Sequence, residues 1–223
     1  MIPAVFLIPF LLFCGVAGAQ PADNGHPKIV KKFIRYDAER VRLSLEYLEN
    51  RHGLVQDRPS IRPKMIVLHY TGSGTAQSVY AYFNRTEIDP GRDYNKKEST
   101  LNVSSQYLVD RDGTIYQLME DTLFARHTIG LNYCAIGIEN VGGSSAPLTD
   151  KQVDANVALI RHLYGLFPGI EYLIGHSEYV RFRNTPIWRE TNAKYITYKS
   201  DPGNAFLAKV RGRLKGYALR DRP

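Results

Sequence analysis

Two histidines stand where ligands gather in α/β proteins. His69 ends the apolar run MIVLH, and His176 directly follows the apolar run YLIG. Each marks the carboxyl end of an expected buried strand, which is the edge where open α/β sheets bind their ligands. Two histidines in equivalent positions suggest a catalytic zinc, which commonly takes three protein ligands and a water. Asp201, in KSDPG, is the candidate third ligand, although alone its place before Pro202 favours a helix N-cap.

Three of the other four histidines carry weaker signals. His26 lies in a polar N-terminal stretch, and His162 points away from the apolar stripe of its expected helix. His52 falls in the last turn of another expected helix, where a protonated imidazole suits the helix dipole. We expect no chemistry at these three positions.

Six segments occur in an order that carries a family resemblance: MIVLHYT, SSQYLVDRDGTIYQL, ARH, NYCAIGIENVGG, YLIGHSEY and KSDPGNAF. Together, from about Ile66 to Phe206, they resemble the zinc-dependent N-acetylmuramoyl-L-alanine amidases of the peptidoglycan-recognition-protein-like (amidase 2) family. Those enzymes cleave the amide between the lactyl group of N-acetylmuramic acid and L-alanine of the stem peptide. The resemblance therefore implies a Zn²⁺ cofactor and a peptidoglycan or muropeptide substrate.

The resemblance also implies roles for single residues. The matched positions are three zinc ligands (His69, His176, Asp201), a base (Glu139), an electrostatic stabiliser (Lys199) and two pocket residues (His127, Asn132). The chemistry is consistent, because bound zinc lowers the pKa of water to about 7. A carboxylate then takes the proton of the water, and a cation stabilises the growing oxyanion. An acidic residue inside the apolar run AIGIENV favours a functional role for Glu139 over simple pairing with a lysine.

The chain departs from the family pattern in two places. In many relatives the late histidine and the acidic ligand are closer together than here, where 25 positions separate His176 from Asp201. The added segment is rich in aromatic residues and arginine, and it is either a structural flap or a substrate wall in which Trp188 contacts sugar or peptide. Some relatives also begin the hairpin strand with a catalytic tyrosine, where this chain has Ser105. Glu139 with Lys199 is therefore the expected catalytic pair.

Hydrophobic patterns predict the elements that position these residues. The first helix, 37–52, presents Val41, Leu45 and Leu48, and the helix 149–167 opens with a Thr149–Gln152 capping box. Further helices are expected at 75–83 and 202–217, strands at 65–71, 135–141 and 172–175, and a hairpin over 106–116. Interleaved strands and helices predict a single α/β domain, with a mixed central β-sheet and helices on both faces.

The N-terminus predicts export. Residues 2–17 form an uncharged apolar run that ends at Ala17-Gly18-Ala19, as in a signal peptide cleaved after Ala19. The run is too short for a comfortable membrane span. Cys14 allows a lipoprotein alternative, but the bulky Phe13 before it disfavours that. We expect a periplasmic or secreted protein, with a signal peptide at 1–19, a helical extension at 20–60, a catalytic domain at 61–217 and a basic tail at 218–223.

Composition excludes some functions and leaves others open. Among 223 residues, 29 Lys and Arg against 22 Asp and Glu give a net charge of +7, which favours acidic partners without choosing among them. Nucleic-acid binding is not expected, because the basic residues are dispersed apart from a short run at Lys209–Lys215 and no nucleic-acid motif appears. Two cysteines exclude a disulfide-rich scaffold and a four-cysteine zinc site. A peptidoglycan-binding module without catalysis remains an alternative, although such modules usually lack a zinc ligand and all three candidates are present here.

Overall fold

A mixed β-sheet forms the centre of the protein. The computed structural model describes residues 27–91 and 96–223, and within these it contains one six-stranded sheet in the order β1-β4-β3-β5-β2-β6. The strands are β1 (Ile29–Lys31), β2 (Met65–Tyr70), β3 (Tyr107–Val109), β4 (Ile115–Gln117), β5 (Ala135–Asn140) and β6 (Tyr172–Gly175). β3, β5, β2 and β6 run parallel, whereas β4 is antiparallel to β3 and carries β1 parallel at the edge. The mixed sheet predicted from the sequence is confirmed.

The register of the central strands decides what meets at their carboxyl ends. β2 and β5 pair along their whole length, and this pairing sets His69 opposite Glu139. On the other side of β2, Leu68 pairs with Gly175, so His176 follows at the level of His69. Both strands are apolar and buried along most of their length, as central strands covered on two faces require.

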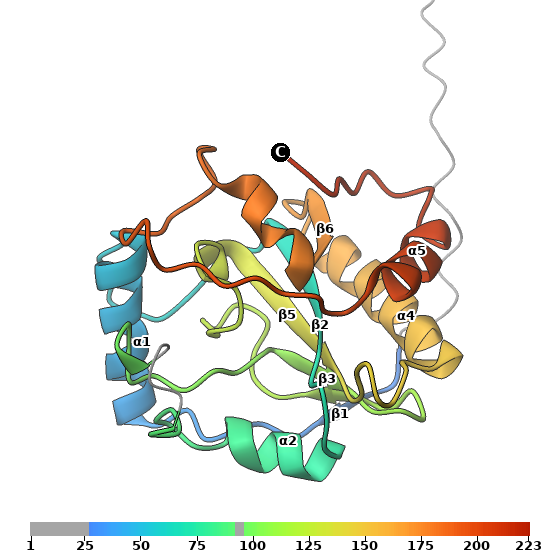
Figure 1. Ribbon diagram of the computed structural model, residues 1–223, viewed down its shortest axis with the longest axis horizontal. Coiled ribbons are helices and arrows are strands. Elements are labelled where there is room, and N and C mark those ends of the chain that lie inside the picture. The colour runs from blue at the N-terminus through green and yellow to red at the C-terminus, as the bar shows by residue number, and fades with distance from the viewer. Residues whose placement is uncertain (1–26, 92–95) are drawn as a thin grey trace, which may run out of the picture.

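Helices cover both faces of this sheet. Ile66 and Leu68 point toward α4 (Asp150–Leu166) and α5 (Asn204–Gly212), in one apolar cluster with Val157, Ile160 and Val210. The alternate residues Met65 and Val67 face the opposite side, where they pack with Tyr179 and Phe182 of the 3₁₀ helix η2 (His176–Phe182). Helix α2 (Ala76–Phe83) lies on that second face too, against Leu108 of β3. Figure 1 shows α4 and α5 side by side, with α2 on the other side of the strands.

Helix α1 (Ala38–His52) is bound to the loops beside the sheet. Asp37 caps it by accepting from the Arg40 amide at 3.0 Å, and Gly53, at φ 62°, ends it in the left-handed region. The Arg40 guanidinium is buried and donates to the carbonyls of Phe83 and Arg85. The buried face is not the one predicted, because Val41 and Leu45 are only partly buried. It consists of Arg40, Leu43, Ser44, Tyr47, Leu48, Arg51 and His52.

Two further differences from the predicted elements are local. The last helix spans Asn204–Gly212, shorter than the predicted 202–217, although Leu214 beyond its end remains buried. Glycine is a poor helix former, which is consistent with an end at Gly212. The strand β1 was not predicted, because three residues are too few for a hydrophobic pattern.

The predicted signal peptide and Cys14 lie outside the described residues. Within 27–91 and 96–223, no helix is long and apolar enough to cross a membrane.

Candidate metal centre and active-site cavity

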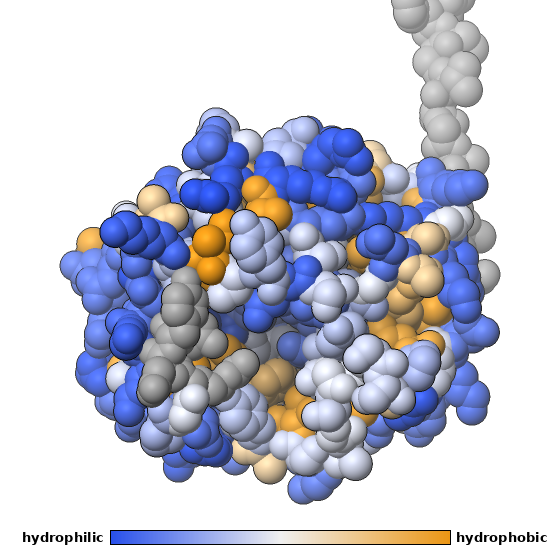
Figure 2. All heavy atoms as spheres, in the orientation of Figure 1, coloured by the Kyte–Doolittle hydropathy of each residue, from blue (hydrophilic) through white to orange (hydrophobic). Residues whose placement is uncertain are grey.

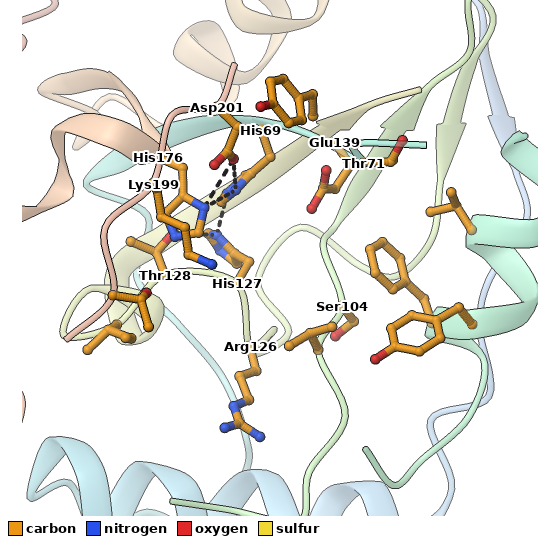
Figure 3. Close-up of a pocket in the computed structure, with 18 of the residues that line it drawn as sticks. His69, Thr71, Ser104, Arg126, His127, Thr128, Glu139, His176, Lys199 and Asp201 are labelled. Carbon is orange, nitrogen blue, oxygen red and sulfur yellow. Dashed lines mark hydrogen bonds and ion pairs between the residues drawn. The ribbon is translucent and has the colours of Figure 1, made fainter. Parts of the chain in front are cut away.

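Three side chains from separate parts of the chain converge beside the sheet. His69 comes from the end of β2, His176 from the first residue after β6, and Asp201 from the segment before α5. His69 is 1% exposed, and His176 and Asp201 are each 8% exposed. Figure 3 shows the three side chains pointing toward one another. These are the three ligands predicted from the sequence.

The atoms that face each other are all metal ligands. Nδ1 of His69 lies 3.0 Å from Nδ1 of His176, and Oδ2 of Asp201 lies 3.3 Å and 3.1 Å from these two nitrogens. A tetrahedral zinc with bonds of about 2.0 Å separates its ligand atoms by roughly 3.3 Å. Two imidazoles and one carboxylate at this spacing therefore fit a zinc ion with a fourth position open to the cavity.

The protonation states agree with this fit. Burial and, to a smaller extent, the neighbouring His69 lower the pKa of His176 to about 4, against the opposing effect of Asp201. Burial alone would raise the pKa of Asp201, but the neighbouring His176 and His69 rings hold it well below its usual value. Metal binding requires neutral imidazoles and an ionised carboxylate.

Asp201 is free to face the histidines because it does not cap a helix. The N-cap of α5 is Gly203, two residues later. The Asp201 carbonyl instead accepts from the Ser177 amide at 2.9 Å, so the third ligand is tied to the residue after the second. Gly175 leaves the room for this approach, since a Cβ there would lie 2.9 Å from Pro202.

Glu139 and Lys199 flank the cluster. Glu139 is half-buried near the end of β5, in register with His69. Lys199 is exposed, and its charge lies close enough to His176 to contribute to lowering the pKa of that histidine. In Figure 3 the two side chains lie on either side of the three candidate ligands. A carboxylate and a cation are thus available beside the ion position.

His127 and Asn132 lie in one turn of chain beside His69. Nδ1 of His127 is 3.0 Å from Nε2 of His69, and burial holds the pKa of His127 well below its usual value. Asn132, at the start of the 3₁₀ helix η1 (Asn132–Cys134), accepts from the His127 and Thr128 amides at 2.8 Å and 2.6 Å. The Asn132 side chain therefore orders the turn that carries His127.

A cavity of about 710 Å³ joins these residues, and its lining includes all of the predicted site residues except Trp188. Figure 2 shows this face of the molecule hollowed near its centre. Trp188 instead stacks on Tyr179, with ring centroids 5.9 Å apart, and lies against Gly130, where a Cβ would be 2.7 Å from the indole. The predicted sugar or peptide contact of Trp188 receives no support from this placement, because its ring packs within the fold.

The chain matches a known family over most of this architecture. Residues 59–204 match the N-acetylmuramoyl-L-alanine amidase family, Amidase_2. The chain belongs to this family. Among curated protein sequences, none is similar enough to the chain to count as a match.

Solved structures with the same fold include an amidase and a recognition protein. The N-acetylmuramoyl-L-alanine amidase LysC from Clostridium intestinale URNW aligns with a TM-score of 0.51 and 19% identity, covering 87% of this chain and 99% of its own. The bumblebee peptidoglycan recognition protein PGRP-SA aligns with a TM-score of 0.52 and 17% identity, covering 88% of this chain and 99% of its own. At these identities the likeness shows the fold alone.

The inserted segment of this amidase-family chain borders the cavity through residues other than Trp188. Tyr195 and Thr197 line the cavity just before Lys199. The Tyr179 hydroxyl donates to the Thr197 carbonyl at 2.6 Å and accepts from its amide at 2.8 Å. The far end of the insertion is thus tied back to η2 at its beginning.

Several buried lining residues were not predicted from the sequence, among them Tyr47 and Arg126. Tyr47 reaches the cavity from α1, and its hydroxyl lies 3.5 Å from the Asn132 amide nitrogen. The Arg126 guanidinium lies over the Tyr47 ring, 5.2 Å from its centroid, and donates to the Ser99 carbonyl at 3.0 Å and the Tyr195 hydroxyl at 3.2 Å. The helical spacing of Leu43, Tyr47 and their buried neighbours on α1 could have indicated that Tyr47 faces inward. Because this face also contains polar residues such as Arg40 and Ser44, it does not form an apolar stripe in the sequence.

Proposed function

We propose that this protein is a zinc-dependent amidase that cleaves the bond between N-acetylmuramic acid and L-alanine in peptidoglycan or its fragments. The observation that carries the proposal is the convergence of His69, His176 and Asp201 at metal-ligand spacing on the floor of a cavity. Membership of the amidase family supports the same bond and substrate. A cavity of about 710 Å³ is within the usual range for small-ligand sites and suits a muropeptide fragment.

The metal would be held by Nδ1 of both histidines and by the Asp201 carboxylate. When bound, Zn²⁺ lowers the pKa of a water molecule and polarises the carbonyl of the amide. The three residues match the common catalytic set of two histidines and one carboxylate with an open fourth position.

The protein's own groups would move the protons. Glu139, beside the ligand cluster, takes a proton from the attacking water and returns it to the amine of the departing L-alanine. Lys199 places positive charge where the tetrahedral oxyanion develops. His127 and Asn132 form the wall against which the substrate lies, and Tyr195 and Thr197 add lining from the insertion. A contact of Trp188 with sugar or peptide stays a prediction.

Nucleic-acid binding receives no support from the basic run near the C-terminus. Lys209 pairs with Asp150 at 2.7 Å, and Arg213 pairs with Asp154, so these two cations are bound to α4. Arg211 pairs with Glu178 of η2. These three charges are thus engaged in contacts within the protein.

The decisive experiment is digestion of purified peptidoglycan by the purified protein, with mass spectrometry of the products. We expect stem peptides with a free L-alanine amino terminus and glycan strands that keep the lactyl carboxylate. Treatment with a chelator should abolish the release, and Zn²⁺ should restore it. Binding of peptidoglycan without release of stem peptide would instead support the non-catalytic recognition module and overturn the amidase proposal.

A further inference from the structure

We propose that His127 is a positioning residue that sets the tautomer of His69, so that Nδ1 of His69 presents its lone pair to the metal. This proposal rests on the proposed zinc site. It gives His127 a task besides lining the cavity, and it depends on a chain of hydrogen bonds from the backbone to the ligand.

The chain begins at the carbonyl of Ala135, the first residue of β5. Nε2 of His127 lies 3.3 Å from this oxygen. A carbonyl oxygen can only accept, so Nε2 of His127 must carry the proton. In the neutral ring the other nitrogen, Nδ1, is then an acceptor.

The second link joins the two rings. Nδ1 of His127 is 3.0 Å from Nε2 of His69, and the ring planes are nearly perpendicular, at 88°. Because Nδ1 of His127 accepts, Nε2 of His69 must donate. The proton of His69 is therefore held on the side away from His176 and Asp201, and its Nδ1 lone pair faces them.

The surroundings hold His127 in this pose. Gly137 leaves space for the ring, because a Cβ there would lie 2.9 Å from Cγ of His127. Asn132 binds the His127 amide from the other side. The Thr128 hydroxyl also lies 2.9 Å from Nδ1 of His127, where it competes with Nε2 of His69 for the single lone pair of this nitrogen and is not needed for the link between the two rings.

Outer partners of this kind fix the orientation of a metal-binding histidine and raise its basicity, and their loss typically costs about 10- to 100-fold in metal affinity. The variant His127→Phe keeps the ring volume and removes both nitrogens. His127→Asn keeps an acceptor, because its amide oxygen can occupy about the position of Nδ1. Thr128→Val is the matched control, since it removes the other neighbour of the same nitrogen.

The test measures zinc affinity by competition with a chromophoric chelator on the full-length protein. We expect the Kd for Zn²⁺ to rise by about 10- to 100-fold in His127→Phe. In His127→Asn the Kd should return most of the way to the wild-type value, and in Thr128→Val it should change by less than about threefold. In metal-free wild-type protein, ¹⁵N–¹H correlation spectra of the imidazoles should place the His69 proton on Nε2.

The outcomes separate the two proposals. Wild-type zinc affinity in His127→Phe, or a His69 proton on Nδ1 in the wild-type spectrum, would overturn the positioning role and leave the amidase proposal standing. The spectrum decides the matter even if His127→Phe does not fold. A wild-type protein that binds no zinc would overturn the proposed function itself.

Discussion

Glu139 and Asp201 are both carboxylates beside the same two histidines, but they face them differently. Oδ2 of Asp201 is within 3.3 Å of both Nδ1 atoms, whereas Glu139 belongs to β5 and approaches from the side of His69. The roles of proposed zinc ligand and proposed catalytic base are therefore separable by mutation.

Glu139→Gln should keep zinc near the wild-type content and lose activity. The amide is nearly isosteric but cannot take a proton from water, and loss of a general base typically costs about 10²- to 10⁴-fold in rate. Metal analysis and amidase kinetics on the same preparation check this. Loss of zinc, or near wild-type turnover, would contradict the assignment of Glu139 as the base.

Asp201→Ala and Lys199→Met provide the contrast. The first should lose both metal and activity, because two histidines alone rarely hold a catalytic zinc. The second should retain zinc, because Lys199 is not a proposed ligand. It should lose up to a few kcal/mol of transition-state stabilisation, about 10²- to 10³-fold in rate, because the positive charge that stabilises the oxyanion is gone. A Lys199→Met variant without zinc would show that this lysine supports the metal site and does not act on the substrate.

His52 should make the protein less stable as the pH falls. The sequence favoured a protonated imidazole at the end of α1, but burial lowers the pKa of His52 to about 4 despite the hydrogen bond to the Arg189 carbonyl. The unfolded chain binds a proton near pH 6.5, where the folded protein does not. The stabilisation linked to the neutral His52 is thus complete above pH 6.5 and is lost as the pH falls toward 4. Over that range the free energy of unfolding should fall by about 3 kcal/mol in total.

Denaturant unfolding of wild type and His52→Phe between pH 7 and pH 4 measures this effect. The phenyl ring retains the contacts with Tyr47 and Tyr133, whose ring centroids lie 5.4 Å and 5.5 Å from that of His52. The free energy of unfolding of wild type minus that of His52→Phe should fall between pH 7 and pH 4. Other groups titrate in both proteins, so their effect cancels in this difference. A constant difference would mean that His52 titrates alike in the folded and unfolded states.

At the scale of elements, α1 clamps the insertion that carries the cavity wall. Arg51, in the last turn of α1, pairs with Glu98 at 2.5 Å and with Glu190, whose side chain is 1% exposed. A backbone hydrogen bond adds to this contact, in which the Thr191 amide donates to the Arg51 carbonyl at 3.1 Å. Figure 1 shows the insertion passing close to one end of α1.

Removing Arg51 should therefore be costly. Arg51→Met leaves Glu190 buried without its cation and should lower the free energy of unfolding by about 3 kcal/mol. Arg42→Met is the matched control on the same helix, since Arg42 pairs with Glu39 and Glu46 at the surface and its loss should cost no more than about 1 kcal/mol. Equal losses in the two variants, measured by denaturant unfolding, would show that the clamp contributes no more than a surface ion pair.

The elements show which parts of the fold a sequence pattern can predict. The strands that carry His69 and Glu139, and the Thr149 cap of α4, were predicted because their signals are local: apolar runs and a capping box. The ligand set followed from strand ends and from family resemblance. The site of Trp188 could not be predicted, because its stacking partner Tyr179 and its contact at Gly130 are tertiary. The Arg51–Glu190 pair is equally non-local, with 139 positions between its partners.

At the scale of the whole molecule, the prediction of export concerns residues outside the described structure. N-terminal sequencing of the protein from its native host should begin at Gln20, because the small residues Ala17 and Ala19 suit cleavage after position 19. Ala19→Phe should block this processing and serve as the control. A lipid-modified start at Cys14 would indicate a membrane anchor, and an intact Met1 would contradict export.

The residues that match the family model and the residues that fold together have different boundaries. The family match covers residues 59–204. Two elements that precede this range contribute to the fold, since β1 pairs with β4 and α1 brings Tyr47 into the cavity. Beyond the range, Leu207 and Val210 of α5 pack in the core. A chimera that exchanges only residues 59–204 with a relative would thus separate these residues from the edge strand, the cavity residue and the α5 core residues that pack against them. A transplant of the proposed site should therefore include the flanks as well as the residues that carry the motifs.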